Sequence, residues 1–225
     1  MGRRTLAAAA RAPLLAALAA LAALAPASLL TPVAARAQGG AIHGTVTVPN
    51  AGITDVVVYL IPAGGAPGAR AVKPLTAEMD QRDLSFVPRV VAVTPGSTVI
   101  FSNSDRVMHN VFHPLQRSDA FDLGTFPPGE WRSFTFGQEG AYVILCHVHP
   151  EMVGYVVVIA SPYRAVTDDH GRFSLDGVAP GTYRLRTWHR RLATHEERVT
   201  VPAGGSVRVA LWLKYGTAAG PTAKP

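Results

Sequence analysis

The sequence has almost no cysteine, since Cys146 is the only one among 225 residues. A chain with one cysteine forms no internal disulfide, which excludes the disulfide-stabilised scaffolds common among small secreted proteins. Charged residues are also scarce, at 16%, so the chain is neither a disordered polyelectrolyte nor a coiled coil. Beyond the N-terminal region, no segment of convincing length has apolar residues at helical spacing, which argues against a helical domain.

The long apolar run of this sequence lies at its N-terminus. Arginines among the first eleven residues flank an alanine- and leucine-rich stretch at about 12–25, and A-R-A follows at 35–37. Positive charge, a short apolar core and an A-x-A site are typical of a secretory signal peptide. The alternative is a membrane anchor, but Pro26 and Pro32 interrupt the run, and a spanning helix needs about 20 apolar residues. We therefore expect a cleaved signal peptide at 1–37, a periplasmic or secreted mature protein, and membrane contact only if the leader stays uncleaved.

The charge pattern does not indicate a nucleic-acid partner. The leader contains four arginines and no acidic residue, so its removal lowers the formal net charge from +6 to +2. The densest basic cluster that remains is Arg184, Arg186, Arg190 and Arg191, and a solvated strand face accounts for it. Because no basic stripe follows one face, we expect no binding to nucleic acid.

Downstream of the leader, the sequence has the pattern of an all-β protein. Short runs rich in valine, tyrosine, phenylalanine and threonine alternate with glycine, proline, asparagine and aspartate, as in β-sandwiches and barrels. Turn dipeptides such as Pro95-Gly96 and Pro180-Gly181 separate several of these runs. The predicted strands are 42–48, 55–61, 90–94, 98–102, 131–136, 141–146, 154–159, 164–167, 172–175, 183–189, 197–201 and 207–213.

The C-terminal part of the chain contains a recognisable strand pattern. The stretch "TDDHGRFSLDGVAPGTYRLRTW" resembles the carboxypeptidase regulatory-like β-sandwich, with its T-D-x-x-G-x-F-x-L and P-G-x-Y-x-L pattern. Such domains begin with two strands that this part lacks and that "IHGTVTVPNAGITDVVVYLIP" supplies near the N-terminus. We therefore predict a discontinuous small β-sandwich made of 41–63 and 161–214, because an exposed loop tolerates the insertion of another domain.

The alternative assigns the strands at 41–63 to the edge of the intervening domain. The glycine-, proline- and alanine-rich stretch at 64–71 has the composition of a linker. The last residues, 215–225, have the composition of a disordered tail.

The single cysteine is followed by other side chains that bind metals. In "YVILCHVHPEMVGYVVV", Cys146, His149 and Met152 have the spacing C-x2-H-x2-M. Thiolate, imidazole and thioether are soft ligands, and a second imidazole would complete the His2Cys plane with a weak axial methionine of a blue-copper site. His109, in "SNSDRVMHNVF", supplies that imidazole if two distant loops meet at one end of a sandwich. Methionine is a poor zinc ligand, which favours copper.

Two stretches around these residues resemble the two halves of a cupredoxin. They are "FVPRVVAVTPGSTVIFSNSDRVMHNVF" and "GAYVILCHVHPEMVGYVVV", and the loop from Cys146 is similar to the short C-x2-H-P-x-M loop of amicyanin-like cupredoxins. The resemblance implies a Greek-key β-sandwich at 75–160. It also implies one mononuclear type 1 copper site, whose ligands are His109, Cys146, His149 and Met152.

The resemblance implies supporting roles for two neighbours of the ligands. Asn110 follows the first ligand histidine, and in cupredoxins this residue ties the two ligand loops together by hydrogen bonds, which fixes the orientation of the ligands. Pro150 has no N–H group, so it removes one potential donor near the thiolate sulfur, and this affects the copper potential.

Other interpretations of these residues remain open. His147 follows Cys146 directly, so strand alternation turns its side chain away from the metal, but it is an alternative ligand to His149. His113 is a weaker candidate, because it lies further along its strand. A buried inert cysteine does not explain the ligand spacing. A cysteine–histidine hydrolase would need an orienting group and a substrate cleft.

Together, these features predict an exported type 1 copper protein that carries single electrons and is not an enzyme. Its partners would be redox proteins that the sequence does not identify, and the small β-sandwich would serve docking or surface attachment. Two other functions are compatible with the sequence. One is a copper-binding or carrier module without electron transfer, and the other is a metal-free adhesion or carbohydrate-contacting β-protein.

Overall fold

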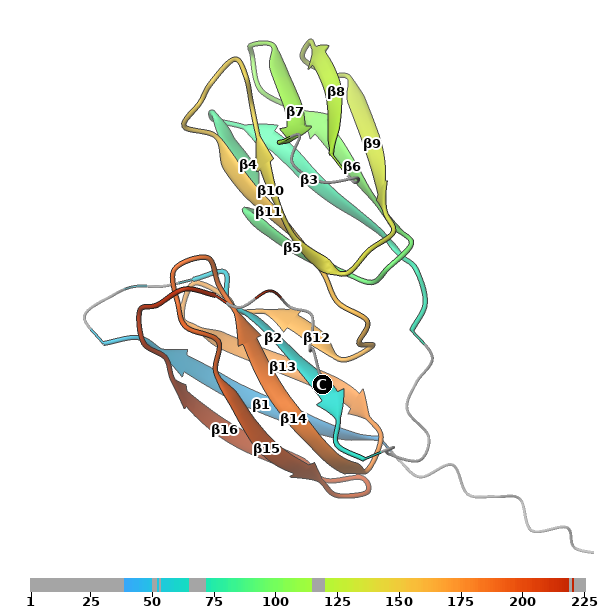
Figure 1. Ribbon diagram of the computed structural model, residues 1–225, viewed down its shortest axis with the longest axis vertical. Coiled ribbons are helices and arrows are strands. Elements are labelled where there is room, and N and C mark those ends of the chain that lie inside the picture. Colours follow the sequence, from blue (N-terminus) through green and yellow to red (C-terminus); the bar gives the residue numbers. More distant parts are fainter. Residues whose placement is uncertain are drawn as a thin grey trace, which may run out of the picture. The chain divides into compact units, whose positions relative to one another are not determined.

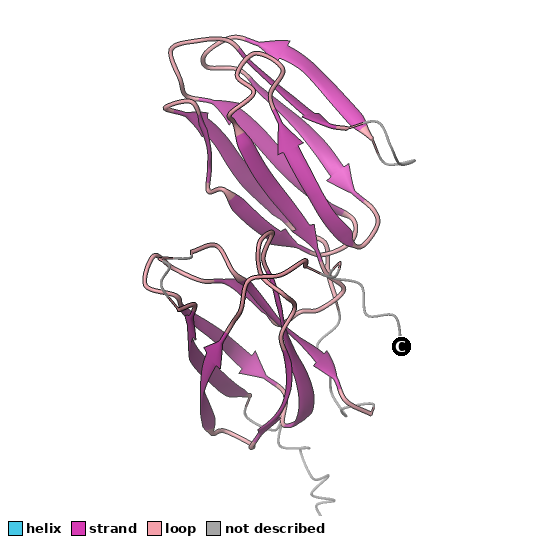
Figure 2. Cartoon of the chain, turned by 60° about the vertical axis from the view of Figure 1, so that its left-hand side comes forward, coloured by secondary structure: helices cyan, strands magenta, loops and turns pink. Residues whose placement is uncertain are grey.

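The computed structural model describes residues 39–49, 52, 54–64, 72–114, 120–218 and 220. Within these residues the regular secondary structure is β-strand, and no helix occurs (Figure 2), so the predicted all-β class is confirmed. The predicted signal peptide lies outside the described residues, as does most of the predicted linker. In the part of the chain that was searched, no helix is long and apolar enough to cross a membrane.

The middle of the chain, from Thr76 to Val158, forms a sandwich of two mixed sheets (Figure 1). The pairs β5–β11 and β3–β6 are parallel, and the other pairs are antiparallel. The five-stranded sheet has the order β5 (Val90–Val93), β11 (Val153–Val158), β10 (Gly140–Leu145), β7 (His109–His113), β8 (Phe121–Phe126). The four-stranded sheet has the order β4 (Ser85–Val87), β3 (Thr76–Arg82), β6 (Ser97–Asn103), β9 (Trp131–Phe136).

The core of this sandwich lies between its sheets because alternate side chains of each strand point inwards. In β6, Val99 and Phe101 are fully buried, whereas the residues between them are only partly covered. Val111 and Ile144 of the other sheet belong to the same apolar cluster. Cys146 and Met152 also belong to this cluster, so two of the predicted ligands are in contact with the core.

The remaining strands form a smaller sandwich. One sheet has the order β13 (Arg172–Val178), β1 (Gly40–Thr47), β16 (Ser206–Trp212), and the other has the order β12 (Arg164–Val166), β2 (Val57–Pro62), β14 (Gly181–Trp188), β15 (Glu196–Val201). Strand β1 pairs antiparallel with β13 and parallel with β16. Strand β2 pairs antiparallel with β12 and β14. The strands that pair with β1 and β2 in these sheets therefore all follow Val158 in the sequence.

Each predicted strand is present to within a few residues, but four strands were not predicted. They are β3, β4, β7 and β8. Strand β3 reads TAEMDQR and β8 reads FDLGTF, so their polar residues and a glycine concealed the β pattern. Strand β3 pairs with the long strand β6, and β8 pairs with β7. This pairing compensates for the weak propensity, because strand stability depends mainly on cross-strand packing.

Backbone pairing continues to Gly216, although the composition of residues 215–225 predicted a disordered tail. Tyr215 forms an isolated antiparallel bridge with Leu192, and the Gly216 N–H donates to the Arg191 carbonyl at 3.1 Å. The prediction of a disordered tail from 215 was therefore wrong for its first two residues, because backbone pairing holds them in place despite their composition.

A further apolar cluster joins the two sandwiches. Tyr59 and Trp188 of the smaller sandwich pack with Val90 and Val157 of the larger one. The Arg164 guanidinium Nε also donates to the Ala92 carbonyl at 3.1 Å. These contacts bury apolar surface from both sandwiches, which favours their association.

Two glycines of the smaller sandwich differ in the space around them: Gly171 lies in the turn before β13, and Gly177 lies in β13. Gly171 and Gly177 both have φ near +70°, at 71° and 65°. A Cβ at Gly171 would meet the Val46 carbonyl oxygen, whereas a Cβ at Gly177 would meet nothing within 4 Å. We expect Gly177→Ala to lower the free energy of unfolding by about 1–2 kcal/mol from backbone strain alone, and Gly171→Ala to lower it by clearly more. Urea denaturation of both variants measures the difference, and equal losses would contradict this account of the turn.

Candidate metal centre

Three of the predicted ligands lie together at one end of the larger sandwich. His109 begins β7, Cys146 directly follows β10, and His149 lies in the loop between β10 and β11. Strands β7 and β10 are neighbours, with Leu145 opposite Phe112, so their pairing brings the two loops to the same end. The ligand atoms of the three residues all lie within 4.8 Å of one another.

The two distances from His109 fit a single small metal ion. His109 Nδ1 lies 3.9 Å from Cys146 Sγ and 3.0 Å from His149 Nδ1. Two donors that each lie about 2 Å from one ion are at most roughly 4 Å apart, so both distances are compatible with shared coordination. His109 is 0% exposed and Cys146 is 3% exposed, whereas His149 is half-buried. The thiol and the first imidazole are thus shielded from water.

The fourth predicted ligand, Met152, is 1% exposed and packs in the apolar core beside the cluster. Its backbone N–H donates to the His149 carbonyl at 3.0 Å, which closes the loop into a tight turn. Pro150 lies exposed within the same turn and contributes no N–H donor. The loop therefore carries cysteine, histidine and methionine within seven residues without needing a long, flexible connection.

Asp105 controls the orientation of the His109 ring. Its carboxylate oxygen lies 3.0 Å from His109 Nε2. Hydrogen bonds from the backbone N–H groups of Leu84 and Arg106, and then from His109, lower the pKa of Asp105 to about 2. Because an ionised carboxylate only accepts hydrogen bonds, Nε2 must carry the proton. The lone pair is then on Nδ1, the atom that lies near Cys146 and His149.

Asn110 links the two loops that carry the cluster. Its backbone N–H donates to Cys146 Sγ at 3.4 Å, and its side-chain oxygen accepts from the His147 N–H at 3.3 Å. Its amide nitrogen donates to Asp122 at 2.7 Å. This is the bridging position that the family resemblance implied for Asn110.

Asp122 holds this bridge from β8. Burial acts to raise the pKa of Asp122, but hydrogen bonds from the Gly124 N–H and the Asn110 amide, with His147 nearby, outweigh it and lower the pKa. Neither Asp105 nor Asp122 was singled out from the sequence. The position of Asp105 four residues before His109 was the only local signal for it, and Asp122 had none.

The structure places the two competing histidines away from the cluster. The His147 ring stacks on Phe112, with centroids 3.6 Å apart, and its Nε2 lies 3.4 Å from Asp122. Both Cys146 and His147 follow the end of β10, and the His147 backbone N–H donates to the Asn110 side chain at 3.3 Å. His113 is buried further along β7, with its Nδ1 2.8 Å from the Val143 carbonyl. The alternative in which His147 replaces His149 does not agree with this geometry.

Comparison with known families identifies two segments of the chain. Residues 74–159 match the family of copper binding proteins named plastocyanin/azurin. Residues 151–214 match the carboxypeptidase regulatory-like domain, a match that includes neither β1 nor β2. No curated protein matches the sequence of the chain.

Several solved structures share part of the chain. A copper-containing nitrite reductase from Thermus scotoductus SA-01 is 30% identical over 44% of this chain and 25% of its own, with a TM-score of 0.36. A purple cupredoxin from Nitrosopumilus maritimus is 25% identical over 36% of this chain and 98% of its own, with a TM-score of 0.33. Amicyanin from Paracoccus versutus is 23% identical over 47% of this chain and 99% of its own, with a TM-score of 0.33.

The chain spans only a quarter of the length of the nitrite reductase. TM-scores this low do not establish a common fold, so the assignment depends on the family matches and agrees with both resemblances seen in the sequence. Residues 74–159 form a copper-binding domain of the plastocyanin/azurin family, and the chain continues into a carboxypeptidase regulatory-like domain.

Proposed function

We propose that this protein is an exported, non-enzymatic carrier of single electrons with one mononuclear type 1 copper site. The ligands would be His109, Cys146, His149 and Met152. The observation that carries the proposal is the cluster of one thiol and two imidazole nitrogens within 4.8 Å. Met152 is buried in the same apolar core as Cys146. Together these groups make the soft donor set of blue-copper electron-transfer sites. Copper bound there would supply a one-electron couple between Cu(I) and Cu(II).

The surroundings of the cluster support electron transfer because they hold the ligands in place. Asp105 fixes the His109 ring. Asn110 ties His109's strand to the Cys146 loop through two hydrogen bonds and to Asp122 of β8 through a third. Partners of this kind set ligand orientation and basicity. A ligand set that cannot rearrange needs little reorganisation when the charge of the site changes, which is the requirement for a carrier.

The exposure of the cluster differs from ligand to ligand. His149 is half-buried at the edge of the cluster, while the other three ligands are buried. Met108 and Val148, which neighbour His109 and His149 in the chain, are 50% and 44% exposed. Exposed apolar residues at one place on a surface favour contact with another protein. We therefore assign His149 as the route by which electrons leave toward a redox protein partner.

The smaller sandwich has no predicted ligands, so we propose that it serves docking or attachment. Because β1 and β2 pair with β12, β13, β14 and β16, we propose that 41–63 and 161–214 form this one discontinuous domain, with the copper domain at 75–160 inserted into it. The proposed export to the periplasm or medium rests on the leader sequence alone, and the absence of a basic stripe leaves no role for nucleic acid.

The experiment that tests this function is copper titration of the purified protein. We expect one equivalent of Cu(II) to produce an intense visible charge-transfer band, because a thiolate ligand is present. Cys146→Ser should remove the band while leaving the near-UV circular dichroism unchanged. Absence of both the band and copper retention in the native protein would favour a metal-free adhesion protein. A band that cannot be reversibly reduced and reoxidised would favour a copper-binding module without electron transfer.

A matched pair of histidine variants identifies the second imidazole ligand. We expect His149→Ala to abolish the visible band, since its Nδ1 is part of the cluster. His147→Ala should leave the band unchanged, because that ring stacks on Phe112. Absorption spectra of both variants at equal copper loading provide the measurement. The reverse outcome would show that His147 is the ligand.

The role of Asp105 can be measured separately from the ligands. We expect Asp105→Ala to weaken copper affinity by about 10–100-fold, the usual effect of losing the carboxylate that orients a ligand histidine. Asp169→Ala is the control, since Asp169 is an exposed aspartate on the turn before β13. Competition with a copper chelator gives both affinities, and equal affinities for the two variants would exclude a positioning role for Asp105.

A further inference from the structure

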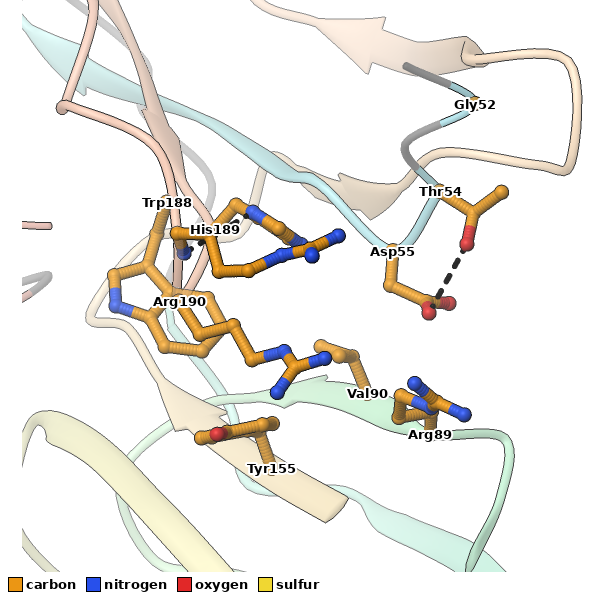
Figure 3. Close-up of a pocket in the computed structure, with 10 residues that line it drawn as sticks. Gly52, Thr54, Asp55, Arg89, Val90, Tyr155, Trp188, His189 and Arg190 are labelled. Atoms are coloured by element: carbon orange, nitrogen blue, oxygen red, sulfur yellow. Dashed lines mark hydrogen bonds between the residues drawn. The ribbon is translucent and has the colours of Figure 1, made fainter. Parts of the chain in front are cut away.

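A cavity of about 130 Å³ lies where residues of the two sandwiches meet (Figure 3). Its lining includes Arg89, which precedes β5, and His189, Arg190 and Arg191, which follow β14. Figure 3 shows the Arg190 side chain extending from beside Trp188 toward Val90 and Arg89. The cavity is about ten times larger than the smallest that holds one water molecule, so a small ligand fits.

The arginines of this cavity have no carboxylate partner, unlike four other arginines in the described chain. Arg132, Arg172, Arg184 and Arg186 each form an ion pair with a carboxylate. Within the described residues, Arg89, Arg190 and Arg191 form none. Three arginines without an ion pair in the described chain therefore line one cavity.

One acidic residue lines the same cavity. Asp55 accepts a hydrogen bond from the Thr54 hydroxyl at 3.2 Å. With three arginines and one aspartate, the lining has a net charge of +2. Glu151 lies in an adjoining cavity that Arg89 and Arg190 also line, but it forms no ion pair with either in the described structure.

The pKa of His189 is affected by the positive charges of two neighbouring arginines. Burial first, and then the charges of Arg191 and Arg190, lower the pKa of His189 to about 4. Its Nδ1 accepts the Arg191 backbone N–H at 3.3 Å. The imidazole is therefore neutral near pH 7 with its proton on Nε2, so it can donate a hydrogen bond but adds no charge.

The backbone that carries these side chains is held by hydrogen bonds. The Arg89 carbonyl accepts from the Tyr155 N–H at 2.9 Å, and the Arg191 carbonyl accepts from the Gly216 N–H at 3.1 Å. The His189 carbonyl accepts from the Leu192 N–H at 3.2 Å. The backbone positions of these residues are thus fixed, while the three arginine side chains are exposed and would be ordered by the ligand.

We propose that this cavity binds a small dianionic oxyanion of the size of sulfate or phosphate. Guanidinium groups present planar pairs of N–H donors that match the oxygens of such ions. The net charge of the lining balances two negative charges, and the guanidinium groups of Arg89 and Arg190 come from different sandwiches. A bound dianion would therefore also strengthen the contact between the sandwiches. None of the proposed copper ligands lines this cavity.

Isothermal titration calorimetry of the purified protein with sodium sulfate or sodium phosphate, at ionic strength held constant with sodium chloride, tests the proposal. We expect saturable binding of both dianions with one site per chain, and at least tenfold weaker binding of acetate. Comparing sulfate with phosphate shows which is preferred. Arg89→Gln and Arg190→Gln should each weaken sulfate binding at least tenfold.

Two further variants separate binding from loss of structure. Asp55→Asn should tighten sulfate binding several-fold, because it removes the opposing charge while asparagine tolerates the positive φ of 64° at this position. Arg198→Gln, which removes an exposed arginine of β15, should leave it unchanged. No saturable heat with either dianion, or an equal loss in Arg198→Gln, would overturn the proposal.

Discussion

The proposed copper site of this protein depends on the hydrogen bonds of Asn110. Its strand, β7, and the loop after β10 are separated by some 36 residues of sequence, and Asn110 joins them through both its backbone and its side chain. Hydrogen bonds between buried groups are costly to leave unmade, so the two loops have one favourable arrangement. That arrangement places the His109 and His149 nitrogens and the Cys146 sulfur close together.

Burial then gives each ligand a different environment. His109, Cys146 and Met152 lie against the apolar core, while His149 lies at the edge of the solvent. Asp105 contacts His109, and Asp122 contacts Asn110. Each carboxylate also accepts one or more backbone N–H hydrogen bonds, which favour its ionised form. The negative charges are thus kept on the far side of His109 and Asn110, and the donor atoms face one another.

The contact between the two sandwiches has a different chemistry. It combines a small apolar cluster around Tyr59, Trp188 and Val157 with a cavity whose arginines have no carboxylate partner in the described chain. Apolar contacts are non-directional, so they hold the sandwiches together without specifying a ligand. The arginines add directional donors, and the adjoining cavity that reaches Met152 puts this region next to the copper loop.

The sequence alone predicts the all-β class, most of the strands and the candidate ligands, because alternation, turn dipeptides and the C-x2-H-x2-M spacing are local properties. It could not reveal β3, β7 or β8, whose polar residues are stabilised by neighbouring strands. It favoured His149 over His147 as a ligand and kept His147 as an alternative, and it did not reveal the roles of Asp105 and Asp122. These strands and side-chain roles depend on which distant segments lie together in the folded chain, so local sequence patterns do not reveal them. Strand β7 pairs with β8 and β10 beside the proposed copper cluster. The turn after β14 meets Arg89 at the cavity.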